Sequence, residues 1–133
     1  MDIADKAAAL TLRMSASEFL KRARESNLHD SVVVKWYRFR EQWSDIFTEH
    51  ILSKPRMGML HKGGAKTCEL WGPFQFEVIK RIAGDLASIN RATSIIEAED
   101  DIIEGCNYCK DKASRWGRSI ASAIGNIEPF SRV

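Results

Sequence analysis

The stretch TSIIEAEDDIIEGCNYCKDKASRWGRSIASAIG, residues 93–125, decides the fold. Apolar side chains recur in it every seven residues, at Ile95, Ile102, Cys109, Trp116 and Ala123. Cys106, Ala113 and Ile120 fill the offset positions, which completes the apolar stripe of an amphipathic helix. The pattern therefore predicts one long C-terminal helix from Thr93 to Gly125 that faces a core.

Charged residues are ordered along the same stretch. Acidic residues fill its first half, at Glu97, Glu99, Asp100, Asp101 and Glu104, and basic residues its second half, at Lys110, Lys112, Arg115 and Arg118. This order matches the helix macrodipole, which favours anions near the N-terminus and cations near the C-terminus. We interpret it as a solvated, dipole-matched face; an acidic docking patch is the alternative.

Small residues recur every four positions in this predicted helix, at Gly105, Cys109, Ala113, Gly117, Ala121 and Gly125. A ridge of small side chains lets another helix approach closely. Each glycine inside a helix costs about 1 kcal/mol relative to alanine, and close packing would offset that cost. We therefore predict a helix–helix interface at Gly105, Ala113, Gly117 and Ala121, with the partner helix in the same chain or in a second copy.

The N-terminal part of the chain is predicted to be helical. Residues 2–13 carry apolar side chains at helical spacing, at Ile3, Ala7, Leu10 and Met14. Ser15 and Glu18 then match a capping box, which indicates either a break near Met14 and Ser15 or one helix with a phase change.

Two further helices are predicted, over residues 31–52 and 73–90, although the start of the first, SVVVKWYRF, is rich in β-branched and aromatic residues and is also compatible with a strand. Asp30 suits the N-cap of the first, whose apolar face includes Trp43 and His50, and Phe76 begins the apolar stripe of the second. The fold class is therefore all-α, a compact bundle of four or five helices with one long C-terminal helix. We expect a single domain over residues 1–133, in which the hairpin of 73–90 and 93–125 packs on 31–52 and residues 126–133 form a loose tail.

Composition bounds the function. The chain has 133 residues, 44% of them hydrophobic, and a formal net charge of +2, so any nucleic-acid binding must rest on local clusters of basic residues. Three cysteines are too few for a disulfide scaffold and suit a reducing, cytoplasmic location. The N-terminus lacks the pattern of a secretory signal, and no apolar run reaches the roughly 18 residues of a membrane span, so no membrane partner is expected.

The strongest cluster of basic residues lies in the Gly-rich loop at 54–66. Lys54, Arg56, Lys62 and Lys66 occur there without any acid, and Lys35 and Arg38 lie among the aromatic residues of KWYRFR. Lysines and flexible backbone amides bind phosphates, and basic residues interleaved with aromatics suit single-stranded nucleic acid. These six residues are the candidate nucleic-acid site. The alternative is that these residues bind no nucleic acid, because the aromatic side chains are buried in the core and the charged side chains are only solvated.

Zinc is a weaker candidate ligand. Cys106 and Cys109 form a C-x-x-C pair that, with His61 and Cys68, has the composition of a structural zinc site. Against this, the pair is predicted to lie mid-helix on the apolar stripe, where both cysteines suit the core. We therefore expect no cofactor, with zinc as the alternative.

Catalytic motifs are missing from the sequence, which contains no H-E-x-x-H and no G-x-S-x-G. His50 lies on an apolar helix face and is interpreted as a hydrogen-bonded core residue. The sequence thus favours a small non-enzymatic accessory or regulatory protein, as viruses and phages often encode, that acts by binding. Nucleic-acid binding through the basic loop is the first hypothesis, and a protein-interaction or oligomerisation module that uses the small-residue ridge is the second.

Overall fold

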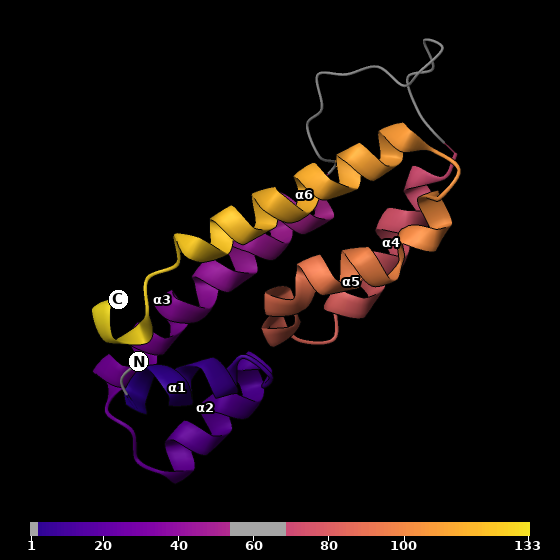
Figure 1. The fold of residues 1–133 in the computed structure, drawn as a ribbon. Helices are drawn as coiled ribbons and strands as arrows, with labels where there is room; N and C mark the ends of the chain where they lie inside the picture. The colour runs from indigo at the N-terminus through magenta and orange to yellow at the C-terminus, as the bar shows by residue number, and fades with distance from the viewer. Residues whose placement is uncertain (1–2, 54–68) are drawn as a thin grey trace.

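The computed structural model describes residues 3–53 and 69–133. In these two segments the chain forms no strand and is all-α, as the sequence predicts (Figure 1). The α-helices are α1 (Ile3–Thr11), α2 (Ala16–Glu25), α3 (Asp30–Ile46), α4 (Trp71–Ile82), α5 (Ala92–Ala98) and α6 (Asn107–Gly125). Shorter elements are the π-helix η1 (Phe47–Leu52) and the 3-10 helices η2 (Leu86–Arg91), η3 (Asp100–Ile103) and η4 (Phe130–Arg132).

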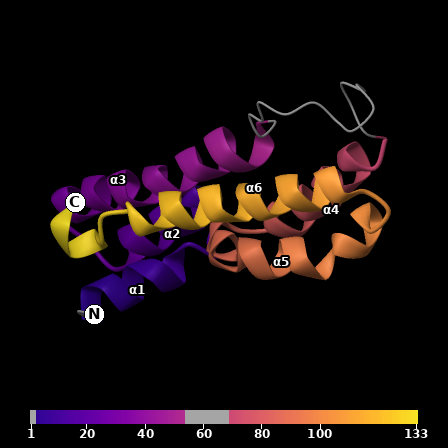
Figure 2. The same ribbon diagram turned by 45° about the horizontal axis from the view of Figure 1, so that its top comes forward.

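Helices α3 and α6 lie side by side and form the long axis of the molecule (Figures 1 and 2). Helices α4 and α5 pack beside the first half of α6, whereas α1 and α2 lie at the other end, near both chain termini. The main core runs between these helices, and Phe74, Ile103 and Ile120 are each 0% exposed in it.

An aromatic cluster anchors α4 to α6. The ring centroids of Trp71 and Phe74 lie 5.6 Å and 6.2 Å from that of Trp116. The indole N–H of Trp116 donates to the carbonyl oxygen of His50 at 2.6 Å, and that of Trp71 donates to Oε1 of Gln75 at 3.0 Å. Large apolar rings are thus buried with their polar atoms paired, which is the condition for burying tryptophan without a penalty.

The predicted helix over 93–125 is broken. It forms α5, then η3, and the long C-terminal helix α6 begins only at Asn107. Cys106 is extended at φ −135° and ψ 108° and caps α6, because its Sγ accepts a hydrogen bond from the backbone N–H of Cys109 at 3.4 Å. Gly105 has a low helix propensity and favours the turn. The heptad pattern does not reveal the break, because α5 and α6 each carry a buried apolar stripe and apolar residues therefore recur on both sides of it.

Helix α1 buries the face opposite to the predicted one. Ile3 is 85% exposed and Leu10 64% exposed, whereas Asp5, Ala8 and Leu12 are buried. Ala8 and Leu12 join the main core on this face, and the carboxylate of Asp5 accepts hydrogen bonds from the backbone N–H and the hydroxyl of Ser131, at 2.7 Å and 2.9 Å. A buried carboxylate that receives two hydrogen bonds is well satisfied, so α1 turns that face inward.

Capping explains the start of α2 and of α3. Ser15 is the N-cap of α2 and accepts from the N–H of Glu18 at 3.1 Å, which agrees with the capping-box prediction. The N-cap of α3 is His29 rather than the predicted Asp30, since the Nδ1 atom of His29 accepts from the N–H of Ser31 at 3.1 Å.

Helices α3 and α4 end before the predicted limits of 52 and 90. The chain continues past Ile46 as the π-helix η1, and past Ile82 it turns into η2, where Asp85 caps by accepting from the N–H of Ser88 at 2.9 Å. Phe76, predicted to begin the buried stripe of this region, is 63% exposed, and Phe74 and Val78 are buried instead. The buried face of α4 is set by the aromatic cluster with Trp116.

The C-terminal tail is held by α1 and α3 and so differs from the loose tail expected over 126–133. Besides the bonds from Ser131 to Asp5, Gln42 on α3 exchanges two hydrogen bonds with the backbone of Glu128, at 2.9 Å and 3.1 Å. Phe130 packs edge-on against Phe39 with ring centroids 6.1 Å apart. These contacts join the tail to the same end of the bundle as α1.

Candidate functional site

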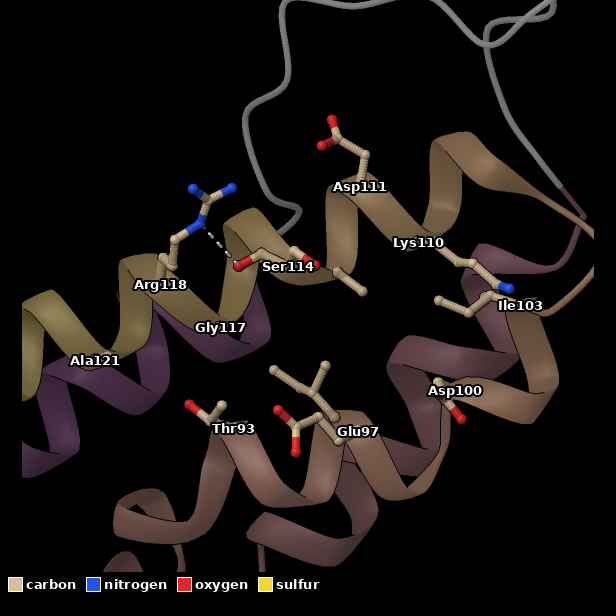
Figure 3. A pocket seen from close by; sticks show the side chains of 12 residues that line it. Thr93, Glu97, Asp100, Ile103, Lys110, Asp111, Ser114, Gly117, Arg118 and Ala121 are labelled. Carbon is tan, nitrogen blue, oxygen red and sulfur yellow. Dashed lines mark hydrogen bonds between the residues drawn. The ribbon is translucent and has the colours of Figure 1, made fainter.

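A groove of about 790 Å³ lies between α5 and η3 on one side and α6 on the other (Figure 3). Figure 3 shows side chains of α5, among them Thr93 and Glu97, directed toward Ser114 and Gly117 of α6. The lining residues are Thr93, Ile96, Glu97, Asp100, Ile103, Lys110, Asp111, Ala113, Ser114, Gly117, Arg118 and Ala121. This groove contains three of the four residues predicted as an interface.

The α6 wall of the groove is the small-residue ridge, reduced to Ala113, Gly117 and Ala121. Gly105 lies in the turn before α6 and does not line the groove, which corrects its assignment to the ridge. At Gly117 the ridge meets α5 of the same chain: a Cβ atom there would lie 3.8 Å from Cδ1 of Ile96 and 3.9 Å from Oγ1 of Thr93. The small side chains thus allow α5 to lie close to α6, and they add little side-chain volume to the floor of the groove.

Charges of opposite sign line the two rims. Glu97 and Asp100 form the acidic rim on α5 and η3, and Lys110 and Arg118 form the basic rim on α6; all four residues are exposed. Among residues 3–53 and 69–133 the ion pairs are Arg81–Glu99 at 2.9 Å and Arg115–Asp111 at 3.0 Å, and neither includes one of these four residues. Asp111 also lines the groove on α6, where Arg115 pairs with it.

The order of acids before bases in residues 93–125 therefore does not belong to one dipole-matched helix. The acids lie on α5, η3 and the turn, and the bases lie on α6, which packs back against α5. Of the charges interpreted as a single solvated face, Glu97, Asp100, Lys110 and Arg118 line the two sides of one groove. The rim residues were missed because the break between α5 and α6 was missed; Gly105, followed by Cys106 as a cap, is the local signal of that break.

A second, smaller groove of about 420 Å³ lies between α3 with η1 and α6 and contains His50. Nδ1 of His50 lies 3.3 Å from Oγ of Ser119, and the ring is half-buried rather than in the core. A nucleophile–base pair needs a third group that orients the base. Asp45 and Glu49 line this groove, but neither is hydrogen-bonded to His50 in the part of the chain that the structure describes. The arrangement therefore gives no specific support to catalysis.

The C-x-x-C pair lies at the N-terminus of α6 and not mid-helix as predicted. Cys106 and Cys109 are 7% and 2% exposed, in agreement with core positions. His61 and Cys68, the other two residues of the predicted zinc set, lie outside the described residues. Over the described ranges no group of three or more His, Cys, Asp or Glu side chains is placed to hold a metal ion, so the zinc site stays a prediction.

The candidate nucleic-acid residues divide in the same way. Lys54, Arg56, Lys62 and Lys66 lie outside the described residues. Lys35 contacts the tail, because its Nζ atom donates to the carbonyl oxygen of Ser131 at 3.4 Å and lies 5.0 Å from the ring centroid of Phe130. Arg38 is exposed on α3, and the 15 residues from it to Ser53 span roughly 22 Å at a helical rise of 1.5 Å. The structure thus places Arg38 well away from Ser53 along the helix axis.

Comparison with known proteins adds no family to this description. The chain matches no known protein family, no curated protein and no solved structure at a significant level. None of the helices that the structure describes is both long enough and apolar enough to cross a membrane. The functional argument therefore rests on the grooves and on the charges that line them.

Proposed function

We propose that this protein is a protein-interaction module that binds a helix in the groove between α5 and α6. The observation that supports this proposal is the pair of oppositely charged rims, whose four charged side chains make no ion pair within the described residues. Exposed charges on both sides of an open groove suit a partner that brings the opposite charges with it.

A helix suits the groove because two helices form its walls. Helix-in-groove binding uses one apolar face of the partner, with side chains at i, i+3, i+4 and i+7 directed into the groove. Ser114 and Ala121 are small and exposed along α6, and Thr93 is exposed on the other wall, so the space between the rims is open. The rims then select for lysine or arginine on one flank of the partner helix and for glutamate or aspartate on the other.

A designed peptide tests the proposal. The probe is an amphipathic helix of about 18 residues, or roughly 27 Å, with leucine on one face, lysine along one flank and glutamate along the other. Titrated into the isotopically labelled protein, it should shift the amide resonances of the groove-lining residues. A peptide of the same length with lysine on both flanks should bind about tenfold more weakly, because one flank then meets the basic rim.

Ser114→Trp supplies the matched test on the protein. Ser114 is exposed and lines the groove, so the indole would fill the space that the partner helix needs. Ser94→Trp is the control, since Ser94 is exposed on α5 and does not line the groove. We expect loss of peptide binding in the first variant only. Equal binding by both variants, or shifts confined to other faces, would refute the groove as the binding site.

Nucleic-acid binding through the basic segment stays a separate prediction. Binding to a mixed-sequence oligonucleotide should weaken steeply with salt and should be lost when Lys62 and Lys66 are both reversed to glutamate. Charge reversal there leaves the groove residues unchanged, so the two hypotheses can be tested independently.

A further inference from the structure

We infer that the partner at this groove is a second copy of this chain, which meets it through the same face. The inference rests on the proposed function, because it names the partner of the same site. In the resulting dimer, α6 of each copy packs on α5 and η3 of the other, and the two grooves together enclose the centre of a four-helix arrangement.

The first step in the argument is the level of each charge along the groove. Helix α5 and helix α6 run in opposite directions, and Gly117 lies level with Thr93 and Ile96. Lys110 precedes Gly117 by two turns, and Asp100 follows Ile96 by one, so both lie at the η3 end of the groove (Figure 3). Each rim thus carries a charge at a level where the other rim carries the opposite charge.

The second step is symmetry. Most homodimers are related by a two-fold axis, which makes the interface self-complementary. If that axis runs parallel to the groove, the rotation keeps each residue of the second copy at the same position along the groove and exchanges the two sides. The acidic rim of the second copy then faces the basic rim of the first. The same operation places its basic rim on the acidic rim of the first copy, so both rim contacts are attractive.

The other two-fold arrangement is excluded by the same charges. An axis that crosses the groove would place α6 on α6 and α5 on α5. The basic rims would then face each other, as would the acidic rims, and like charges placed together across an interface oppose association. The charge layout therefore specifies the orientation of the second copy as well as its identity.

The expected strength follows from the size of the face. The acidic side spans the 12 residues from Ala92 to Ile103, about 18 Å at a helical rise of 1.5 Å, and the face is two helices or roughly 20 Å wide. Stable complexes bury about 800 Å² on each partner, and this face lies below that size. We therefore expect a dimer that dissociates on dilution and at high salt, because the rim charges are screened.

The test uses two charge-reversed variants of the full chain. The acidic-rim variant carries Glu97→Lys and Asp100→Lys, and the basic-rim variant carries Lys110→Glu and Arg118→Glu. Glu97→Lys near the C-terminus of α5 and Lys110→Glu near the N-terminus of α6 agree with the helix dipoles, and Asp100 and Arg118 are exposed, so the helices should be preserved. Glu25→Lys with Glu41→Lys is the control, since both residues are exposed and lie on α2 and α3.

Sedimentation equilibrium over a concentration series gives the dissociation constant of each protein. The parent and the control should have the same dissociation constant. Each rim variant alone should have a dissociation constant at least about tenfold higher, because both of its rims then carry charge of the same sign. An equimolar mixture of the two rim variants should restore the dimer, since every contact in the mixed pair is again between opposite charges. Restoration only in the mixture identifies a second copy on this face.

Three outcomes would overturn the inference. A parent that stays monomeric up to about 1 mM shows that no second copy binds. Rim variants that dimerise as the parent does show that the dimer uses another face, and a mixture that fails to associate refutes the two-fold arrangement. In each case the peptide titration with Ser114→Trp still decides the proposed function, so the two failures are distinguishable.

Discussion

Helices α6 and α1 are held in the fold by different kinds of contact. Helix α6 has 19 residues and buries Trp116 and Ile120, which are 2% and 0% exposed. Helix α1 has nine residues, buries a carboxylate at Asp5, and leaves Ile3 and Leu10 in solvent. The long helix is positioned by apolar area, which its many turns supply. The short helix buries less apolar area, at Ala8 and the adjoining Leu12, so directional hydrogen bonds make up a larger share of the contacts that position it.

The largest expected effect is on the α6 side of this comparison. Trp116→Ala should lower the free energy of unfolding by about 3–5 kcal/mol, because it opens a cavity beneath the aromatic cluster. It also leaves the carbonyl oxygen of His50 without the indole N–H that now lies at 2.6 Å. Urea unfolding followed by circular dichroism measures the change.

Trp116→Phe is the control for a variant that does not fold. It keeps most of the apolar volume and loses only the N–H donor, so a smaller loss of about 1–3 kcal/mol is expected. A loss below about 1 kcal/mol for Trp116→Ala would show that buried area does not position α6.

A middle-sized effect is expected from the polar contact of α1. Asp5→Ala removes the acceptors of two hydrogen bonds from Ser131, which lie at 2.7 Å and 2.9 Å. The free energy of unfolding should fall by roughly 1–3 kcal/mol, because the donors of Ser131 lose their protein partner in a half-buried site. Hydrogen exchange should locate the loss in α1 and the tail.

The matched control for Asp5 is Leu10→Ser on the exposed face of α1. Leu10 is 64% exposed, so the change should stay within about 0.5 kcal/mol. If Leu10→Ser were the more damaging substitution, α1 would have to dock through the apolar face that the sequence predicts.

The smallest effect is expected where α6 meets α5. Gly117→Ala should raise the free energy of unfolding by up to about 1 kcal/mol, because alanine is the better helix former. The added methyl would lie 3.8 Å from Cδ1 of Ile96, an ordinary van der Waals contact. Thermal unfolding compares this variant with Ala113→Gly, which should be destabilised by about 1 kcal/mol. Destabilisation by Gly117→Ala would mean that only glycine allows this approach of α5.

Much of the fold follows from local pattern. Helical class is predictable because the apolar residues recur at helical spacing over most of the chain, and the start of α2 is predictable because Ser15 caps it through the N–H of Glu18. The burial of Cys109, Trp116 and Ile120 also follows from the stripe in residues 93–125. These features depend on residues within a few positions of each other.

The groove was predictable only in part. The small residues Ala113, Gly117 and Ala121 are visible as a ridge in the sequence, but their partner helix is not. Glu97 and Lys110 lie 13 positions apart and were expected on one straight helix, where they could not face a common groove. A single turn at Gly105 and Cys106 reverses the chain and sets these charges on opposite rims.

By itself the sequence determined the helical class, the cap of α2 and the apolar stripe of α6, because each depends on short-range spacing and on hydrogen bonds between near neighbours. Only the tertiary structure decided where the predicted long helix breaks, which face of α1 is buried and which charges line the groove. Those features depend on contacts between residues far apart in the chain, such as Asp5 with Ser131 and Gly117 with Ile96. A periodic pattern states which residues prefer burial, but the surface that buries them exists only after the helices have packed.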